Sequence, residues 1–165
     1  MTRAVVVTGA AGGIGSALCR RLRADGYVAV GMDRTVSTDA DIDLQIDLRD
    51  SEAVTAAARE LARDHELKAI VHNAAVQPLA GAGATSPADW WDTLRVNVIA
   101  VDALVSGARK SLATNHGSVV VVSSVHARAT TGGITAYATS KAALEGWVRD
   151  RKSTRLNSSH ITLSR

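Results

Sequence analysis

Short apolar segments alternate with amphipathic segments along most of the chain. Apolar runs occupy residues 3–8, 27–33, 68–72 and 117–124, with a weaker run at 42–47. Segments with helical spacing of Ala, Leu and charged residues lie between them, at 13–25, 51–65, 86–113 and 135–149. Continuous apolar strands separated by helices predict a parallel sheet that is covered on both faces. The expected fold class is therefore α/β, a doubly wound sheet with five strands present, and ligands are expected at the carboxyl ends of its strands.

Local signals fix two of the helix ends. Gly26 follows the first helical segment at the position where a left-handed residue is favoured. Ser86 precedes the third segment as a cap, Pro87 stands in its first turn, and Asp89 suits the helix dipole. These signals support an alternation of strands and helices.

The size and composition of the chain restrict its class. Its 165 residues suffice for one domain with a real core, packed mainly by Ala, Val, Leu and Gly. The apolar runs fall well short of the roughly 20 residues that a membrane span needs, so no membrane partner is expected. MTRAVVVTG enters a strand at once and shows no signal peptide. Cys19 is the single cysteine, interpreted as a small core residue, and a cytoplasmic location is expected.

The positive net charge does not indicate nucleic acid binding. Residues 1–149 carry 15 Lys and Arg against 15 Asp and Glu, whereas residues 150–165 carry four against one. All of the excess basic charge thus lies in a C-terminal tail of unusual composition. Nucleic acid is therefore not expected as a partner.

A glycine-rich loop follows the first strand. VVVTGAAGGIGSAL places Gly9, Gly13 and Gly15 between that strand and the first helix. A tight turn needs a residue without Cβ, a backbone close to a pyrophosphate needs another, and the helix N-terminus offers N–H groups to phosphates. Strand, glycines and helix in this order predict a dinucleotide site; a merely structural turn is the alternative.

Asp33 closes the second strand, 18 residues after Gly15. A carboxylate there can accept hydrogen bonds from both ribose hydroxyls and would repel a 2′-phosphate. Arg34 beside it is the feature that could serve a 2′-phosphate instead. NAD is accordingly predicted as the cofactor in preference to NADP.

AYATSK contains a phenol and an ammonium on one helix face. Tyr137 and Lys141 are four residues apart, so they are neighbours in space. An ammonium beside a phenol favours the phenolate and suits it to general acid/base work. Ser124 ends the fifth strand, where its hydroxyl could reach the same substrate oxygen. The three residues are the predicted catalytic group.

With these motifs the chain resembles the compact form of the short-chain dehydrogenase/reductase family, with a Rossmann-type fold, over residues 1–149. The matching motifs are TGAAGGIG, HNAA, RVNVIA, VVSSVHA and YATSK. The resemblance implies hydride transfer between NAD and a small-molecule alcohol or ketone, with Tyr137 as acid/base, Lys141 on the nicotinamide ribose and Ser124 orienting the substrate. It also implies that Asn97 holds a water in a proton relay, that Asp47 meets the adenine ring and that Asn73 supports the cofactor side of the sheet. The cofactor residues expected are Gly9, Gly13, Ile14, Gly15, Asp33, Asp47, Leu48, Asn73, Ala74, Tyr137 and Lys141, with no metal ligand.

The chain departs from the family pattern next to the fourth strand. His72 and Ala75 stand where the family usually has Asn and Gly. His72 is interpreted as a hydrogen-bonding residue behind the site rather than a catalyst. His126 is interpreted as a loop residue, with substrate contact as the alternative, and the Trp90–Trp91 pair as packing for the long helix.

The tail is the second departure. The resembled domain runs to about 250 residues, so the chain is interpreted as an incomplete NAD-binding domain at 1–149, missing the last strands and a Pro-Gly loop. DRKSTRLNSSH back-translates, with permitted codons, to a sequencing adapter read in frame. Residues 150–165 are therefore interpreted as a non-native tail, with a basic interaction tail as the alternative. The expected consequences for this chain are an uncovered sheet edge, poor stability and little turnover. The full-length parent is expected to be a homo-oligomer.

Two other functions stay open. A non-catalytic dinucleotide-binding sensor would keep the glycine loop but would not need Ser124, Tyr137 and Lys141. A sugar-nucleotide epimerase or dehydratase of the extended kind usually has a different glycine spacing. The leading interpretation is an oxidoreductase whose substrate cannot be read from these residues.

Overall fold

The computed structural model describes residues 1–153 and 159–164 of the chain. Its N-terminal half contains β1 (Thr2–Thr8), α1 (Gly13–Ala24), β2 (Val28–Asp33), β3 (Ile42–Gln45), α2 (Ser51–Asp64) and β4 (His65–His72). The C-terminal half contains α3 (Pro87–Leu94), the π-helical turn η1 (Arg95–Ile99), α4 (Ala100–Thr114), β5 (Ser118–Ser124), the short 3₁₀ turn η2 (Val125–Ala127), α5 (Thr135–Ser153) and β6 (Ser159–Ser164). The predicted alternation of strands and helices is confirmed.

All strands run parallel in one sheet of order β3-β2-β1-β4-β5-β6. The chain moves from β1 outward to β2 and β3, then crosses back to β4 on the other side of β1. The direction of winding therefore reverses between β1 and β4. In such sheets a crevice forms at this point, outside the carboxyl ends of the two strands.

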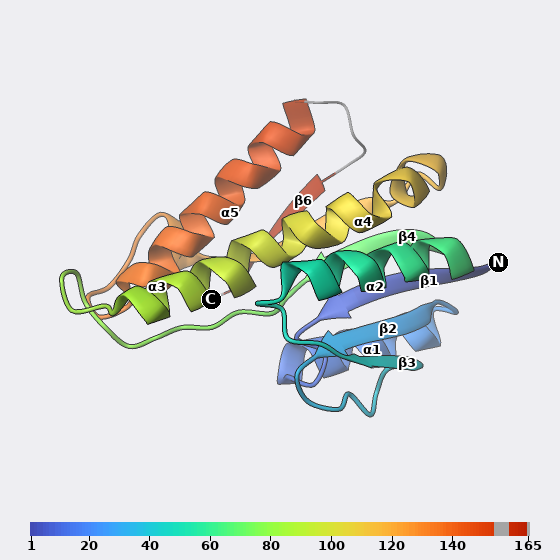
Figure 1. The fold of residues 1–165 in the computed structure, drawn as a ribbon, viewed down its shortest axis with the longest axis horizontal. Helices are drawn as coiled ribbons and strands as arrows, with labels where there is room; N and C mark the ends of the chain where they lie inside the picture. The colour runs from blue at the N-terminus through green and yellow to red at the C-terminus, as the bar shows by residue number, and fades with distance from the viewer. Residues whose placement is uncertain (154–158, 165) are drawn as a thin grey trace.

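Helices cover the two faces of the sheet in the way that right-handed crossovers require. The crossovers to β4, β5 and β6 all run in one direction, and α2, α4 and α5 share a single apolar cluster with the sheet. The crossover from β1 to β2 runs in the opposite direction, and α1 packs through Cys19, Leu18 and Leu22 against Val5 and Val7 on the other face. Figure 1 shows α2 and α4 side by side along the sheet. The fold is thus the predicted doubly wound α/β sheet.

The sequence led us to expect a sheet that ends at the fifth strand, but the structure has a further strand, β6, beside β5. β6 pairs along β5 from Val119 to Ser124, and α5 continues to Ser153 instead of ending at residue 149. Residues 150–153 contain neither Gly nor Pro, so nothing stops the helix there. The edge of β5 offers unpaired backbone groups, which a β-prone stretch such as Ile161-Thr162 satisfies. The expectation of an uncovered β5 edge is therefore wrong.

The long helix expected over 86–113 is divided in the structure. η1 inserts a π-helical turn at Arg95–Ile99, between α3 and α4. π-helical turns are often found at functional sites because the extra residue redirects the side chains around it. Ser86 caps α3 as predicted, since its hydroxyl accepts a hydrogen bond from the N–H of Asp89. Asn97 lies in this turn, and its side chain is fully buried.

The two faces of β4 and β5 differ in how completely they are buried. Ile70, Val119 and Val121 face the layer of α2 and α4 and are 0% exposed. Val71, Val120 and Val122 alternate with them and are only half-buried. Val71 packs against the cluster that α1 forms with β1 and β2, whereas Val120 and Val122 are not part of that cluster. Among the described residues, no helix combines the length and the apolar character needed to cross a membrane.

Candidate functional site

The glycine-rich turn between β1 and α1 lies at the reversal point of the sheet. Gly9 has a φ of +67°, and a Cβ on it would lie 2.9 Å from the Cα of Ala74. A Cβ on Gly15 would collide with the carbonyl of Gly9. Both positions require glycine for the turn itself. A Cβ on Gly13 would meet nothing within 4 Å among the described residues, so the space beside it is open to a ligand.

The N-terminus of α1 faces the same space. Its N-cap is Gly12, which has no side chain to accept a hydrogen bond from the helix. The N–H groups of a first helical turn have no partner within the helix and carry partial positive charge. No acidic residue lies in the first turn of α1, a helix that is described throughout. This end of α1 can therefore bind a phosphate through its backbone.

A cleft of about 520 Å³ opens in front of the turn, within the size range of small-molecule sites. Eight of the predicted cofactor residues line it: Gly9, Gly13, Ile14, Asp33, Asp47, Leu48, Asn73 and Ala74. Gly15 is buried in the first turn of α1, and Tyr137 and Lys141 lie on α5 outside the lining of the cleft. The structure thus gathers one end of the predicted dinucleotide site into a single concave surface.

Asp33 ends β2 at the rim of the cleft, with both carboxylate oxygens hydrogen-bonded. One oxygen accepts from the N–H of Ala11 in the glycine turn at 3.1 Å. The other accepts from the N–H and the hydroxyl of Thr35, each at 3.2 Å. The carboxylate is therefore fixed in orientation, and the oxygen that accepts only from Ala11 has a further lone pair for a ligand hydroxyl.

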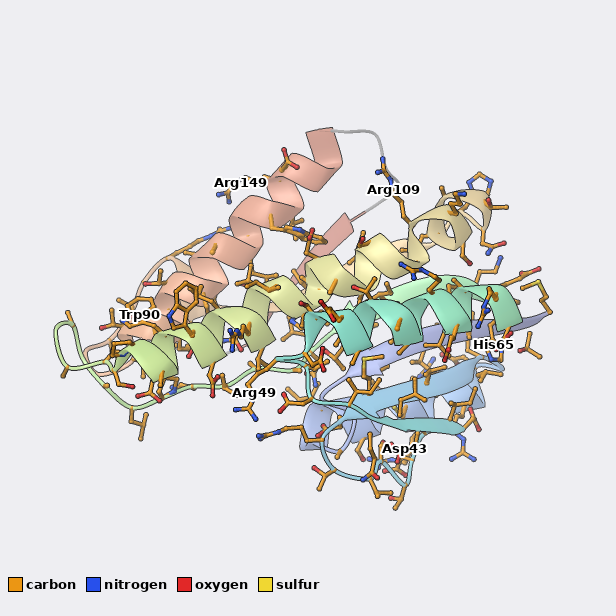
Figure 2. The ribbon with its side chains drawn as sticks, in the orientation of Figure 1. Asp43, Arg49, His65, Trp90, Arg109 and Arg149 are labelled. Atoms are coloured by element: carbon orange, nitrogen blue, oxygen red, sulfur yellow. The ribbon has the colours of Figure 1, made fainter. Side chains whose placement is uncertain are left out.

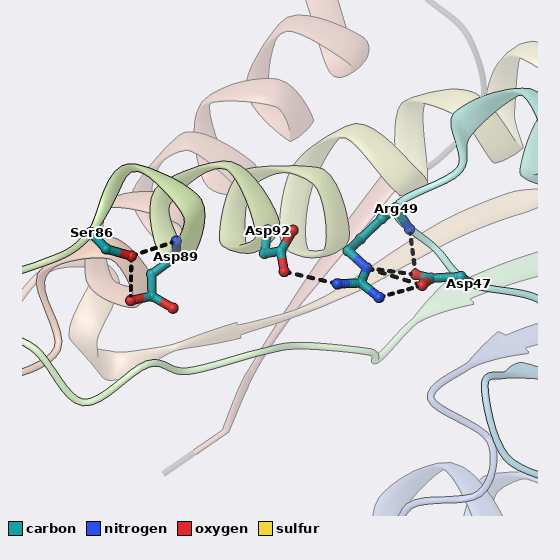
Figure 3. A network of polar contacts seen from close by, with 5 residues as sticks. All are labelled: Asp47, Arg49, Ser86, Asp89 and Asp92. Carbon is teal, nitrogen blue, oxygen red and sulfur yellow. Dashed lines mark hydrogen bonds and ion pairs between the residues drawn. The ribbon is translucent and has the colours of Figure 1, made fainter.

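An ion-pair network closes the opposite rim (Figure 3). The guanidinium of Arg49 donates to both carboxylate oxygens of Asp47, at 2.6 Å and 3.0 Å, and to Asp92 on α3 at 2.9 Å. The hydrogen bonds from Arg49 hold the pKa of Asp47 below its usual value. In Figure 2, Arg49 lies near the start of α2. Arg49 and Asp92 were not singled out in the sequence, because nothing in their spacing indicates a pair across 43 residues.

The end of β4 is tied to the end of β1. The side-chain amide of Asn73 donates to the carbonyls of Thr8 and Gly9, at 3.2 Å and 3.3 Å. The hydroxyl of Thr8 accepts from the N–H groups of Asn73 and Ala74, both at 3.1 Å. These bonds hold the ends of β1 and β4 together, and the role of Asn73 in supporting the cofactor stays a prediction. Thr8 is the first residue of the TGAAGGIG motif, but the sequence does not assign it a role, because its partners Asn73 and Ala74 are more than 60 residues away.

Tyr137 and Lys141 share one face of α5, as predicted. The ammonium of Lys141 lies 5.7 Å from the centre of the Tyr137 ring. Lys141 is 1% exposed, and its ammonium donates to the carbonyl of Val122 in β5 at 2.7 Å. Burial lowers the pKa of Lys141 to about 8. A buried cation beside a phenol is an arrangement that stabilises negative charge on the phenol oxygen.

Ser124 lies at the end of β5, close to the same helix. Its hydroxyl accepts a hydrogen bond from the N–H of His126 at 3.3 Å, and it is 4% exposed. The ring of His126 in turn meets the ring of Tyr137 edge to face, with the ring centres 6.4 Å apart. His126, in the loop after β5, therefore contacts both Ser124 and Tyr137.

The side chain of Asn97 on η1 connects two segments that are distant in the sequence, one at Val76 and one at Ser140 on α5. Its side-chain oxygen accepts from the N–H of Val76 at 2.8 Å, while its amide donates to the carbonyl of Val76 at 3.0 Å and to Ser140 at 2.9 Å. Both amide hydrogens are thus engaged with the protein. The hydroxyl of Ser140 donates to the carbonyl of Tyr137 at 2.7 Å. The water that Asn97 is expected to hold stays a prediction. The side chain of Asn97 positions the start of α5 through Ser140.

His72 is 0% exposed and hydrogen-bonded to Thr8 at 3.0 Å, which confirms its interpretation as a hydrogen-bonding residue behind the site. Burial, with the nearby charge of Lys141, lowers the pKa of His72 to about 4, although the backbone of Asn97 and Val96 partly offsets the shift. The imidazole is therefore neutral at pH 7.

Two further groups differ from the sequence analysis. Figure 2 draws Trp90 on the side of α3 that faces α5, but Trp91 is 60% exposed, so the packing role predicted for Trp91 is wrong. Glu145 on α5 was not singled out, yet it is 3% exposed and accepts hydrogen bonds from Ser123 and Arg128, at 3.1 Å and 3.2 Å. These hydrogen bonds from Ser123 and Arg128 to Glu145 hold the end of β5 and the loop after it against α5.

Sequence comparison agrees with this geometry. Residues 3–162 match the sequence profile of the family described as short chain dehydrogenase. The chain belongs to the short chain dehydrogenase family. It is 32% identical to Dehydrogenase/reductase SDR family member 4 from Bos taurus over 165 residues, which cover 90% of this chain and 58% of that protein.

Solved structures of short chain dehydrogenases superimpose closely on the chain. One is an oxidoreductase from Brucella ovis in complex with a partially ordered NAD, with a TM-score of 0.83 and 32% identity over 93% of this chain and 78% of that one. Another is a metagenomic short-chain oxidoreductase in complex with NADP, with a TM-score of 0.86 and 25% identity over 98% of this chain and 79% of that one. These relatives hold NAD or NADP, and both belong to the fold described above.

Proposed function

We propose that the protein is an NAD-dependent oxidoreductase that interconverts an alcohol and a ketone or aldehyde by hydride transfer. The observation that carries the proposal is the buried ammonium of Lys141 beside Tyr137, in a chain that also presents a glycine-lined cleft at the reversal point of its sheet. Family membership supports the same reaction class. The chain spans 58% of the length of the bovine relative, so the activity is proposed for the whole protein.

The residues of the cleft fit a dinucleotide. Gly13 leaves open space beside the N-terminus of α1, where backbone N–H groups suit a pyrophosphate. Asp33 suits the ribose hydroxyls of the adenosine half, and Asp47 and Leu48 line the end of the cleft where an adenine would lie. Ile14, Asn73 and Ala74 complete the walls. These residues would hold the cofactor, and Lys141 would hold its nicotinamide ribose.

The remaining residues handle the proton. The bound nicotinamide cofactor supplies or accepts the hydride. Tyr137 gives a proton to the substrate oxygen, or takes it, at its phenol oxygen, and Lys141 stabilises the negative charge that the phenol then carries. Ser124 donates a hydrogen bond to the same substrate oxygen and orients it. Asn97 fixes the start of α5 through Val76 and Ser140, which keeps the acid/base group in place.

We propose NAD rather than NADP as the preferred cofactor. Asp33 is held at the rim of the cleft by Ala11 and Thr35, so its carboxylate cannot easily swing away from a 2′-phosphate. A carboxylate beside a bound 2′-phosphate would repel it, and that repulsion would favour the free ribose of NAD. Arg34 also lines the cleft and is the residue that would favour the opposite choice.

Cofactor binding is the direct test of the proposal. Titration calorimetry of the purified chain should show tighter binding of NAD than of NADP. Asp33→Asn keeps an oxygen acceptor but removes the negative charge, so it should narrow the preference. Equal affinity for the two cofactors in the unmodified chain would reject the preference, and absence of binding to either would reject the dinucleotide site.

Tyr137→Phe separates an enzyme from a sensor. An NAD-linked assay over a panel of small alcohols and ketones should show that this variant of the whole protein loses nearly all turnover while it keeps its affinity for NAD. A dinucleotide sensor would have no turnover to lose, and its response to a partner would survive the substitution.

We further propose that the whole protein is a cytoplasmic homo-oligomer. The single Cys19, which is buried and free, supports the cytoplasmic location. The family resemblance supports the homo-oligomer.

A further inference from the structure

The hydroxyl of Thr8 is surrounded by three hydrogen-bond partners in the interior. A Thr hydroxyl has one hydrogen to donate and two lone pairs with which to accept. The N–H groups of Asn73 and Ala74 point at Thr8 Oγ1 from 3.1 Å and occupy both lone pairs. The third partner is Nδ1 of His72, 3.0 Å away. Because Thr8 is 0% exposed, its hydrogen has no solvent to bond with and must point to His72.

This count determines the form of the imidazole. If the hydrogen of Thr8 points to Nδ1 of His72, that nitrogen is an acceptor and carries no proton. A neutral imidazole then has its single hydrogen on Nε2. A charged imidazole would carry hydrogens on both nitrogens, and two hydrogens would then meet between His72 and Thr8. The depressed pKa of His72, about 4 in its buried setting, agrees with the neutral form.

We propose that His72 is a positioning residue of the cofactor cleft: as an Nε2-protonated imidazole it takes the hydroxyl hydrogen of Thr8, and so keeps the oxygen of Thr8 facing the backbone of Asn73 and Ala74. The role rests on the proposed dinucleotide site. His72 itself lies behind the cleft and acts through Thr8.

The packing of the turn makes this position matter for binding. Asn73 and Ala74 both line the cleft, and the Cα of Ala74 lies within 2.9 Å of where a Cβ on Gly9 would be. The amide of Asn73 also holds the carbonyl of Gly9. If the Thr8 hydroxyl rotated, two N–H groups would lose their acceptor and the end of β4 would shift against the glycine turn. Gly9 would then move with it.

Nitrogen NMR tests the tautomer without any cofactor. In the ¹⁵N-histidine-labelled chain, the His72 resonances are assigned as those that vanish in His72→Asn, and long-range proton–nitrogen correlations distinguish the two tautomers. At pH 7 we expect a proton on Nε2 and none on Nδ1. A proton on Nδ1, or a charged ring, overturns the inference whether or not the chain binds NAD.

Two substitutions of His72 test the acceptor role. His72→Asn keeps an oxygen acceptor near the Nδ1 position, whereas His72→Gln places its amide near the Nε2 position and leaves Thr8 without an acceptor. Loss of one buried hydrogen bond should weaken NAD binding about tenfold in His72→Gln. His72→Asn should restore most of the affinity. If the Asn variant is as weak as the Gln variant, His72 does not act as an acceptor for Thr8.

A double-mutant cycle with Thr8→Val shows whether His72 acts through the hydroxyl. His72→Gln in the Thr8→Val background should cause no further loss of NAD affinity, because the hydroxyl that His72 orients is already absent. Additive losses would overturn the proposal. Thr8→Ser is the control that keeps the hydroxyl, and thermal melting of every variant identifies those that are unfolded at the assay temperature.

The same cycle can be read without the cofactor. If the unmodified chain binds no NAD, the proposed function fails on its own, and the coupling between Thr8 and His72 is then measured from the free energy of urea unfolding. Coupling between the two substitutions, together with the Nε2 tautomer, would still support the acceptor role of His72. Absence of coupling would reject it.

Discussion

Burial of the Lys141 ammonium should lower the free energy of unfolding, and a substitution that removes the charge should raise it again. Burial lowers the pKa of Lys141 from 10.5 to about 8. The unfolded chain therefore holds this proton more tightly than the folded chain does, so protonation favours unfolding. The cost is fully present below pH 8 and disappears as the pH rises through 10.5.

The magnitude follows from the size of this shift. A difference of about 2.5 pKa units corresponds to about 3 kcal/mol at pH 7, and by pH 10 linkage leaves only about 1 kcal/mol of it. Lys141→Met keeps the length of the side chain but carries no charge, so it should escape the cost at both pH values. It also loses the hydrogen bond to the carbonyl of Val122, which offsets about 1 kcal/mol of the gain at either pH.

Urea unfolding at pH 7 and pH 10 measures this difference. The free energy of unfolding of Lys141→Met should exceed that of the unmodified chain at pH 7, and the excess should shrink by about 2 kcal/mol at pH 10. The comparison at each pH cancels other groups that titrate. Lys110→Met, on the exposed side of α4, controls for the loss of a lysine as such. An excess that is the same at pH 7 and pH 10 would refute the reasoning, even if Lys141→Met lost NAD-linked activity.

The remaining predictions concern the turn, the rim of the cleft and the tail. Gly13→Ala should leave the thermal melting temperature unchanged but weaken NAD binding, whereas Gly15→Ala should destabilise the fold because its Cβ meets the carbonyl of Gly9; equal melting temperatures for the two variants would contradict this. Arg49→Leu should raise the carboxyl pKa of Asp47 toward its usual value, as measured by carbon NMR titration, with only a small change in melting temperature. The non-native origin proposed for residues 150–165 predicts that genomic DNA encodes a different sequence after residue 149, and matching codons there would disprove it.

The strands, the helices and the motif residues were readable because each rests on a local pattern. The glycine turn follows from Gly9, whose φ of +67° is a conformation that side chains disfavour. The pair Tyr137 and Lys141 follows from helix periodicity. The division of the helix at η1 was not readable, since RVNVIA has no helix breaker. The π-helical turn accompanies the hydrogen bond between Asn97 and Val76, a contact between segments 21 residues apart.

Other features depended on neighbours that only the fold supplies. The strand β6 was not expected because its composition is polar, yet the open edge of β5 provides the partner for its backbone. Arg49 bridges Asp47 and Asp92 because α3 happens to end beside the loop before α2. Trp91 was expected to pack and is exposed, because Trp90 occupies the side of α3 that faces α5.

The sequence by itself determined the alternation of strands and helices, the conformation of the glycine turn and the side chains that carry the proposed chemistry, because these depend on residues close together in the chain. The tertiary structure decided the protonation of His72, the depressed pKa of Lys141 and the hydrogen-bond role of Thr8. Each of these depends on how far water is excluded and on which groups from distant segments remain to share a proton, and neither can be counted before the sheet and its helices are packed together.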